Sequence, residues 1–84
     1  FRIDPSNGLA IYDQLSRQIK FMVAHGVLRE GDLIPSVREL AGRVAVNPNT
    51  VARSYRDLQT EGVVEPVRGE GLRVAEGAQS RCHE

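Results

Sequence analysis

The side chains best suited to bind another molecule lie between residues 47 and 60, where arginine, asparagine and threonine recur at helical spacing. With about 100° per residue and Val51 at 0°, Tyr55 and Leu58 fall within about 40° of Val51. Thr50 and Asp57 flank a polar set on the opposite side. That set, at roughly 140–200°, consists of Asn49, Arg53, Arg56 and Thr60. The pattern predicts a helix with one buried side and one exposed polar side.

This polar side has the chemistry of direct base recognition. Arginine can donate two hydrogen bonds to guanine, asparagine can pair in the same two-point way with adenine, and threonine can contact a thymine methyl group or a phosphate. The ordinary alternative is that Arg53 and Arg56 are solvated charges and that Arg53 forms an ion pair with Asp57 four residues later.

Further candidates lie outside this side of the helix. Arg38 lies in the first turn of an earlier helix, where backbone amides attract phosphate, which favours a DNA contact over the alternative of a plain surface charge. Asn47 is expected mainly to cap the next helix, with any phosphate contact secondary. Arg68 and Gly69 lie at a hairpin tip, where glycine lets the backbone approach a minor groove or simply makes the turn.

Three helices are expected to position these residues. The first covers residues 9–25, where apolar side chains form one stripe. The second covers residues 36–44 and opens with a capping box, in which the Ser36 hydroxyl and the Glu39 side chain each bind the other's backbone amide. The third covers residues 48–61, with an asparagine cap before it and a proline in its first turn.

A β-hairpin over residues 63–74, with its tip at 68–71, is expected to follow the helices. The order predicts a mainly α fold with a small hairpin wing, a winged helix-turn-helix domain over residues 9–74. Residues 1–8 are a turn-rich lead-in. Residues 75–84 show no apolar periodicity and are predicted to be a linker or tail towards a missing C-terminal segment.

Composition sets further bounds. The chain has 84 residues, enough for one domain, and no apolar run approaches the roughly 20 residues of a membrane span. Lys+Arg and Asp+Glu number 11 each, so any argument for DNA binding depends on where the charges lie. The single cysteine excludes an internal disulfide, and His25, Cys82 and His83 form no catalytic arrangement. We therefore expect no enzyme activity, cofactor, metal site or small-molecule site in this segment.

Several longer motifs resemble the GntR family of bacterial winged-helix repressors. They are LIPSVRELA (33–41), VNPNTVARSYRDL (46–58), EGVVE (61–65) and RGEG (68–71), with weaker similarity in AIYDQL (10–15) and GVLREGD (26–32). Together they cover about residues 9–74. The NPNTVARSY form is most similar to the YtrA-type branch, and the DNA-binding part of the aminotransferase-fused MocR-type branch is the alternative.

The resemblance implies DNA contacts at matching positions of this chain. These are Arg38 on the operator, Asn47, Asn49 and Thr50 at the start of the recognition helix, and Arg68 and Gly69 in the minor groove. Pro48 and Ala52 stand where some relatives carry arginine, so base reading is expected to shift towards Arg53. Operator sequences of those relatives should therefore not be transferred to this chain.

The sequence thus predicts the DNA-binding module of a GntR-type regulator, a repressor acting on nucleoid DNA in the bacterial cytoplasm. Helix 48–61 would enter the major groove and wing 63–74 the minor groove. The full-length parent is expected to be a homodimer on a palindromic operator, while this segment alone, lacking apolar anchors after Val74, is expected to be mainly monomeric. The alternative is a winged-helix module for protein–protein interaction, which the neutral net charge favours.

Overall fold

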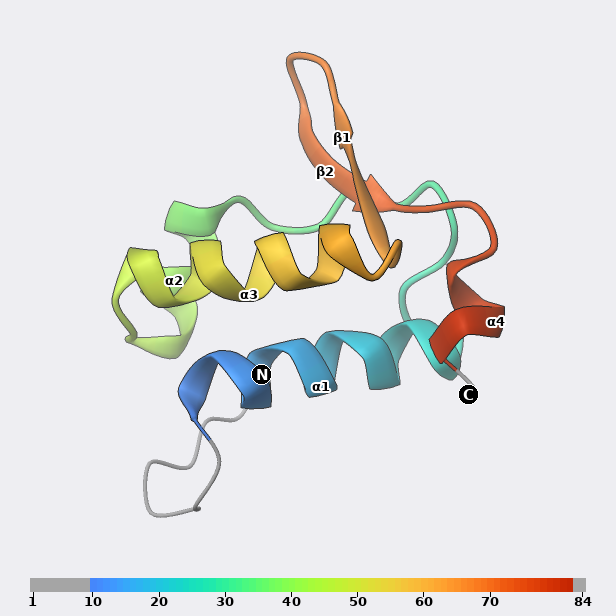
Figure 1. Ribbon diagram of the computed structural model, residues 1–84. Coiled ribbons are helices and arrows are strands. Elements are labelled where there is room, and N and C mark those ends of the chain that lie inside the picture. Colours follow the sequence, from blue (N-terminus) through green and yellow to red (C-terminus); the bar gives the residue numbers. More distant parts are fainter. Residues whose placement is uncertain (1–9, 83–84) are drawn as a thin grey trace.

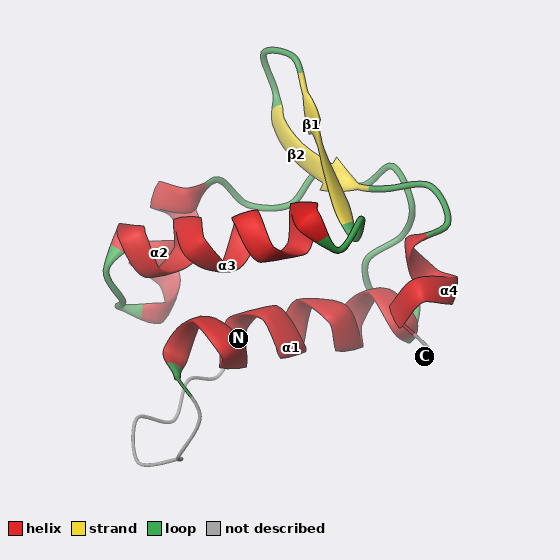
Figure 2. Ribbon diagram, viewed as in Figure 1, coloured by secondary structure: helices red, strands yellow, loops and turns green. Residues whose placement is uncertain are grey.

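The computed structural model describes residues 10–82, and Figures 1 and 2 show how the elements within that range are arranged. In chain order they are α1 (Ile11–Ala24), α2 (Val37–Val44), α3 (Pro48–Thr60), β1 (Val64–Val67), β2 (Gly71–Val74) and α4 (Ala78–Cys82). The predicted lead-in 1–8, together with residue 9 and residues 83–84, lies outside the described residues. The described part contains no helix long and apolar enough to cross a bilayer.

Helix α1 forms because its apolar residues recur at helical spacing. Its side chains Leu15, Ile19 and Val23 are buried, as the sequence predicts. The helix ends at Ala24 with His25 as its C-cap, and Gly26 next to it adopts a φ of 76° that costs glycine little. The amide of Leu28 donates to the carbonyl of Met22 at 3.1 Å and closes the end of the helix.

Helices α2 and α3 form the predicted helix-turn-helix, and both begin with a side-chain cap. The Ser36 hydroxyl accepts a hydrogen bond from the Glu39 amide at 3.1 Å. The reciprocal half of the predicted capping box does not form, because the Glu39 carboxylate accepts instead from Arg43, one turn later, at 2.8 Å. Between the helices, Ala45 takes a left-handed conformation with φ of 55°, which makes the connection tight.

Strands β1 and β2 form the predicted antiparallel hairpin, which projects beyond α3 (Figure 1). Val64 pairs with Val74 at its base, and both side chains are buried. The other edge of β2 is covered by the extended segment at Leu33, which bridges to Arg73. Strand β1 is therefore the open edge, the position that the proline at residue 66 requires.

One core holds the helices and the base of the hairpin together. Helix α3 lies centrally, with α1 running alongside it (Figure 1). The buried cluster consists of Leu15, Ile19, Val23, Ile34, Leu40, Ala41, Val51, Tyr55, Leu58, Val63, Val64, Val74, Ala75 and Ala78. Side chains of α1, α2 and the base of the hairpin share this cluster with α3 and fix the orientation of α3.

After Val74 the structure differs from the sequence prediction of a tail without ordered elements. Helix α4 packs on the C-terminal end of α1 (Figure 2), and Ala78 is fully buried there. The Ala75 amide donates to the Val63 carbonyl at 2.9 Å, and the Gly77 amide donates to the Glu30 carboxylate at 2.6 Å. The segment has small buried residues and backbone hydrogen bonds instead of an apolar stripe, so a search for periodicity does not detect it.

Candidate nucleic-acid interface

Helix α3 has one buried side and one open side, as its spacing predicts. Val51, Tyr55 and Leu58 are buried. The opposite side is exposed at all four predicted polar positions, which are Asn49, Arg53, Arg56 and Thr60. Asp57 and Thr50, which flank that set, are half-buried. The helix therefore presents polar side chains to solvent while its apolar side is fixed in the core.

Two buried polar contacts set the position of α3. The Tyr55 hydroxyl donates to the Pro35 carbonyl at 2.6 Å, which ties α3 to the segment before α2. Burial raises the pKa of the Tyr55 phenol to about 12; the nearby Glu39 carboxylate adds to this rise and the Arg43 guanidinium opposes it. The phenol therefore stays neutral at physiological pH and keeps its donor.

The second contact joins α3 to α1. The Ser54 and Ser16 hydroxyl oxygens lie 2.8 Å apart in a buried hydrogen bond. Neither serine was predicted from the sequence, because nothing in the pattern links two residues 38 positions apart. Helix-wheel position alone would have placed Ser54 beside the buried residues Val51 and Tyr55.

At the N-terminal end of α3, the side chain of Asn47 is engaged in capping. Its Oδ1 accepts a hydrogen bond from the Asn49 amide at 2.8 Å. The capping role predicted for Asn47 is therefore present. The Asn49 side chain is exposed and Thr50 is half-buried beside it. Arg38, exposed in the first turn of α2, lies on the neighbouring helix of the same motif.

The hairpin tip is open and tightly turned. The Glu70 amide donates to the Val67 carbonyl at 3.0 Å, and Gly69 between them adopts a φ of 78°. A Cβ built on Gly69 would meet no atom within 4 Å, so glycine serves the backbone conformation here and not a crowded site. Arg68, next to it, is exposed.

The basic residues of the described part form two groups, those with a carboxylate partner and those without one. Lys20, Arg43 and Arg73 form ion pairs with Glu61, Glu39 and Glu65 respectively. The candidate DNA-binding arginines have no ion pair with any carboxylate of residues 10–82; they are Arg38, Arg53, Arg56 and Arg68. Arg17 and Arg29, which lie outside the three candidate regions, also have none. The charges of the candidate arginines are therefore available to an anionic partner.

Arg53 has a different neighbour from the one that spacing suggested. Its guanidinium carbon lies 3.8 Å from the centroid of the Tyr12 ring on α1. An Arg53–Asp57 ion pair, the ordinary alternative from the sequence, is not formed. Tyr12 was not predicted to take part in the site, since it comes 41 residues earlier and on a different helix.

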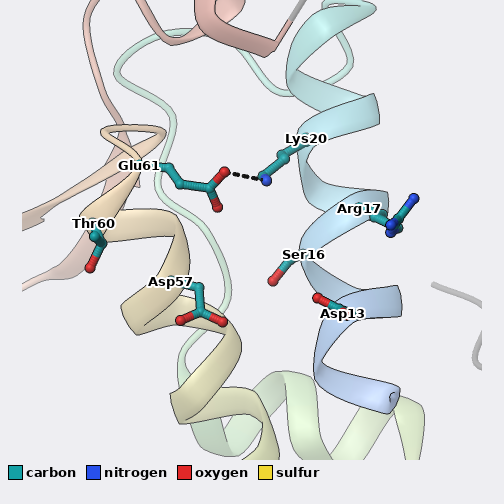
Figure 3. A pocket seen from close by; sticks show the side chains of 7 residues that line it. All are labelled: Asp13, Ser16, Arg17, Lys20, Asp57, Thr60 and Glu61. Atoms are coloured by element: carbon teal, nitrogen blue, oxygen red, sulfur yellow. Dashed lines mark hydrogen bonds and ion pairs between the residues drawn. The ribbon is translucent and has the colours of Figure 1, made fainter. Parts of the chain in front are cut away.

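A polar groove of about 450 Å³ separates α1 from the C-terminal half of α3 (Figure 3). The Lys20–Glu61 ion pair spans it, and Asp57 faces α1 across it. Its lining residues are Asp13, Ser16, Arg17, Lys20, Asp57, Thr60 and Glu61. Among the residues that the structure describes, no group of three His, Cys, Asp or Glu side chains is placed to hold a metal ion.

Comparison with known proteins places this geometry in context. The family model described as "Bacterial regulatory proteins, gntR family" matches residues 11–74. The HTH-type transcriptional repressor YtrA of Bacillus subtilis is 42% identical over 79 residues, which cover 94% of this chain and 61% of that protein. This chain therefore spans less than two thirds of the length of that curated relative.

Solved structures are similar over the same region. "YtrA from Sulfolobus acidocaldarius, a GntR-family transcription factor" superposes with a TM-score of 0.84 at 37% identity, covering 89% of this chain and 79% of that one. A structure of AraR(DBD) in complex with operator ORX1 superposes with a TM-score of 0.78 at 26% identity, covering 89% of this chain and 93% of that one.

Proposed function

This chain belongs to the gntR family of bacterial regulatory proteins, and from that premise we propose that it binds double-stranded DNA in a sequence-specific way. The observation that carries the proposal is the set of arginines without carboxylate partners at the start of α2, on the open side of α3 and at the hairpin tip. Free guanidinium groups bind phosphate and guanine through several hydrogen bonds at once.

In the proposed complex, α3 enters the major groove with its open side against the bases. Arg56 lies on that side, with Arg53 about one turn and Asn49 about two turns before it. These three side chains would read base edges, while Thr50 would contact a base or phosphate. Asn47, with its side chain engaged in the cap, would contribute through its position at the helix N-terminus.

Two further elements would flank this helix on the duplex. Arg38 in the first turn of α2 would bind a phosphate, which fixes register without reading sequence. Arg68 and Gly69 at the hairpin tip would enter the minor groove, where the open turn lets the backbone approach closely. The AraR(DBD) structure, which has the same fold and is in complex with operator ORX1, supports double-stranded DNA as the partner.

The longer protein is proposed to act as a homodimeric repressor on a palindromic operator in the bacterial cytoplasm. A two-fold dimer places two recognition helices about one helical turn apart, which matches two half-sites. The name of the Bacillus subtilis relative supports repression. We propose no enzymatic activity and no small-molecule site for residues 10–82.

The test is selection of duplexes from a randomised pool, followed by fluorescence anisotropy on the selected sequence at several salt concentrations. The logarithm of the association constant should fall linearly with the logarithm of the salt concentration, with a slope of about −0.9 for each phosphate contacted. Arg38→Gln should reduce that slope by about one unit, because one phosphate contact is lost. Lys20→Gln, which removes a charge already paired with Glu61, is the matched control.

A competing function is protein–protein recognition by the same fold, which the formal net charge of +0 favours. Failure to enrich any duplex, or binding that does not change with salt, would support that function and contradict DNA recognition. Equal affinity for selected and shuffled duplexes would leave DNA binding in place but remove the claim of sequence specificity.

A further inference from the structure

We propose that Tyr12 on α1 is a positioning residue for Arg53 on α3, keeping its guanidinium away from Asp57 and free to bind DNA. The inference rests on the proposed DNA-binding function and adds a specificity-determining residue outside the helix-turn-helix. It also implies that α1, which makes no contact with DNA through Tyr12 itself, influences base recognition.

The contact geometry leaves the donors of Arg53 available. The guanidinium carbon lies 3.8 Å from the centroid of the Tyr12 ring, which places the planar group over the ring face. A guanidinium this close to a ring can lie flat on it, and its N–H donors, which lie in the guanidinium plane, then remain open to a further partner. Arg53 is exposed and Tyr12 is half-buried, so the ring is a supported surface under a solvent-facing charge.

Asp57 is the competing partner. It lies four residues after Arg53, within reach along the same helix, and it faces the groove between α3 and α1 (Figure 3). In the structure the two side chains form no ion pair. In an i,i+4 ion pair, the order with the basic residue before the acidic one is the weaker of the two. Arg53 precedes Asp57, so a contact with an aromatic ring can replace their ion pair.

The stack is not needed to hold the two helices together. The buried Ser16–Ser54 hydrogen bond and the Lys20–Glu61 ion pair already join α1 to α3. Several apolar side chains of both helices also share the core. An effect of Tyr12 on DNA recognition can therefore be separated from an effect on folding.

The experiment compares Tyr12→Leu and Tyr12→Phe on the selected duplex, alone and combined with Arg53→Ala or Asp57→Asn. Tyr12→Leu should weaken binding by about two- to fivefold, because an exposed cation–π contact corresponds to that range at about 1.4 kcal/mol per tenfold. Tyr12→Phe, which keeps the ring, should stay within about twofold. Thermal unfolding of each variant, and the Arg53 Nε–H resonance, are measured in parallel.

Three results identify a positioning role. Tyr12→Leu should have no further effect on affinity once Arg53 is alanine, and adding Asp57→Asn to Tyr12→Leu should restore most of the loss. The Arg53 Nε–H resonance should lose its ring-current shift in Tyr12→Leu but keep it in Tyr12→Phe. A purely structural role would move the melting temperature and leave all three results absent.

The proposal is overturned if Tyr12→Leu leaves affinity unchanged, or lowers it equally with and without Arg53. It is also overturned if Asp57→Asn gives no recovery in the Tyr12→Leu background. Absence of any duplex binding by the unmodified chain would instead remove the proposed function itself, which is a different result from normal wild-type binding with no coupling between Tyr12 and Arg53.

Discussion

Both sides of α3 carry polar side chains, but those on the buried side have partners within the protein and those on the exposed side face solvent. On the inner side the polar groups Ser54 and Tyr55 are buried, and each has a hydrogen-bond partner within the protein. On the outer side Arg56 and Asn49 are exposed, and Arg56 has no carboxylate partner among residues 10–82. Buried polar groups need hydrogen-bond partners within the protein because water cannot reach them. Exposed polar groups are hydrated and can exchange water for a binding partner.

This difference explains how a chain of zero formal charge can present a basic surface. Lys20 on α1, Arg43 at the end of α2 and Arg73 on β2 are paired with nearby glutamates, whereas Arg17 on α1 is not. The net charge of the chain therefore combines regions where basic residues are neutralised by ion pairs with regions where they are not. The informative quantity is the pairing of each charge and not the total.

The largest expected effect is on the inner side. Leu58→Ala should lower the free energy of unfolding by about 2–5 kcal/mol, because Leu58 is fully buried and a cavity would remain. Urea denaturation measures the change. Gln59→Ala, at the exposed neighbouring position, should stay within about 0.5 kcal/mol. Equal losses in both variants would show that the two sides of α3 do not differ in packing.

On the outer side the main effect should appear in DNA affinity. Arg53→Ala and Arg56→Ala should each cost about 1–3 kcal/mol on the selected duplex and relax base preference at one position. The unfolding curve should not move for Arg56→Ala, because that side chain is exposed, and should move by no more than about 0.5–1 kcal/mol for Arg53→Ala, which loses the contact with Tyr12. If affinity fell equally on every duplex, the altered arginine would be a phosphate contact and its assignment to base reading would be wrong.

The N-terminal end of α3 allows a comparison between two asparagines. Asn47→Ala should lower the free energy of unfolding by about 0.5–2 kcal/mol, because the cap to the Asn49 amide is lost. Asn49→Ala should leave the melt unchanged and weaken DNA binding. A melting temperature that falls in Asn49→Ala but not in Asn47→Ala would contradict this assignment.

A smaller effect is expected from removing the hydroxyl of Tyr55. Tyr55→Phe should lower the free energy of unfolding by about 0.5–1.5 kcal/mol at pH 7, because the hydrogen bond to the Pro35 carbonyl is lost. The raised pKa of about 12 means that the phenol ionises in the unfolded chain at lower pH than in the folded one.

The advantage of the wild type is therefore fully present below pH 10 and declines as the pH rises towards 12. Chemical denaturation of both proteins at pH 7 and at alkaline pH measures the difference. A gap between wild type and Tyr55→Phe that widened with pH would contradict the assigned burial of the neutral phenol.

Local sequence signals were sufficient for most of the fold and for the open side of α3. Short-range sequence patterns predict the caps at Ser36 and Asn47, the apolar stripe of α1 and the hairpin around Gly69. Each of these features is present in the structure. The exposure of Arg53 and Arg56 follows from helix periodicity alone. Such features need no knowledge of distant residues.

Features that depend on long-range packing were not predictable in this way. The Tyr12–Arg53 stack and the Ser16–Ser54 hydrogen bond join α1 to α3 across about 40 residues of chain, and no spacing rule connects them. Helix α4 is held by buried Ala78 and by backbone contacts, which leave no apolar stripe to detect. Glu39 pairs with Arg43 instead of completing the capping box, a choice between two local partners that the sequence leaves open.

The most direct test of the central claim is amide chemical-shift mapping of the chain during titration with the selected duplex. The account predicts that the largest shifts occur at Arg38, Asn49, Arg56 and Gly69, on α2, α3 and the hairpin tip. Amides on the far side of α1 and on α4, such as Phe21 and Gln79, should remain unchanged. Shifts concentrated on α1 and α4, with α3 unaffected, would contradict the claim that the open side of α3 recognises DNA.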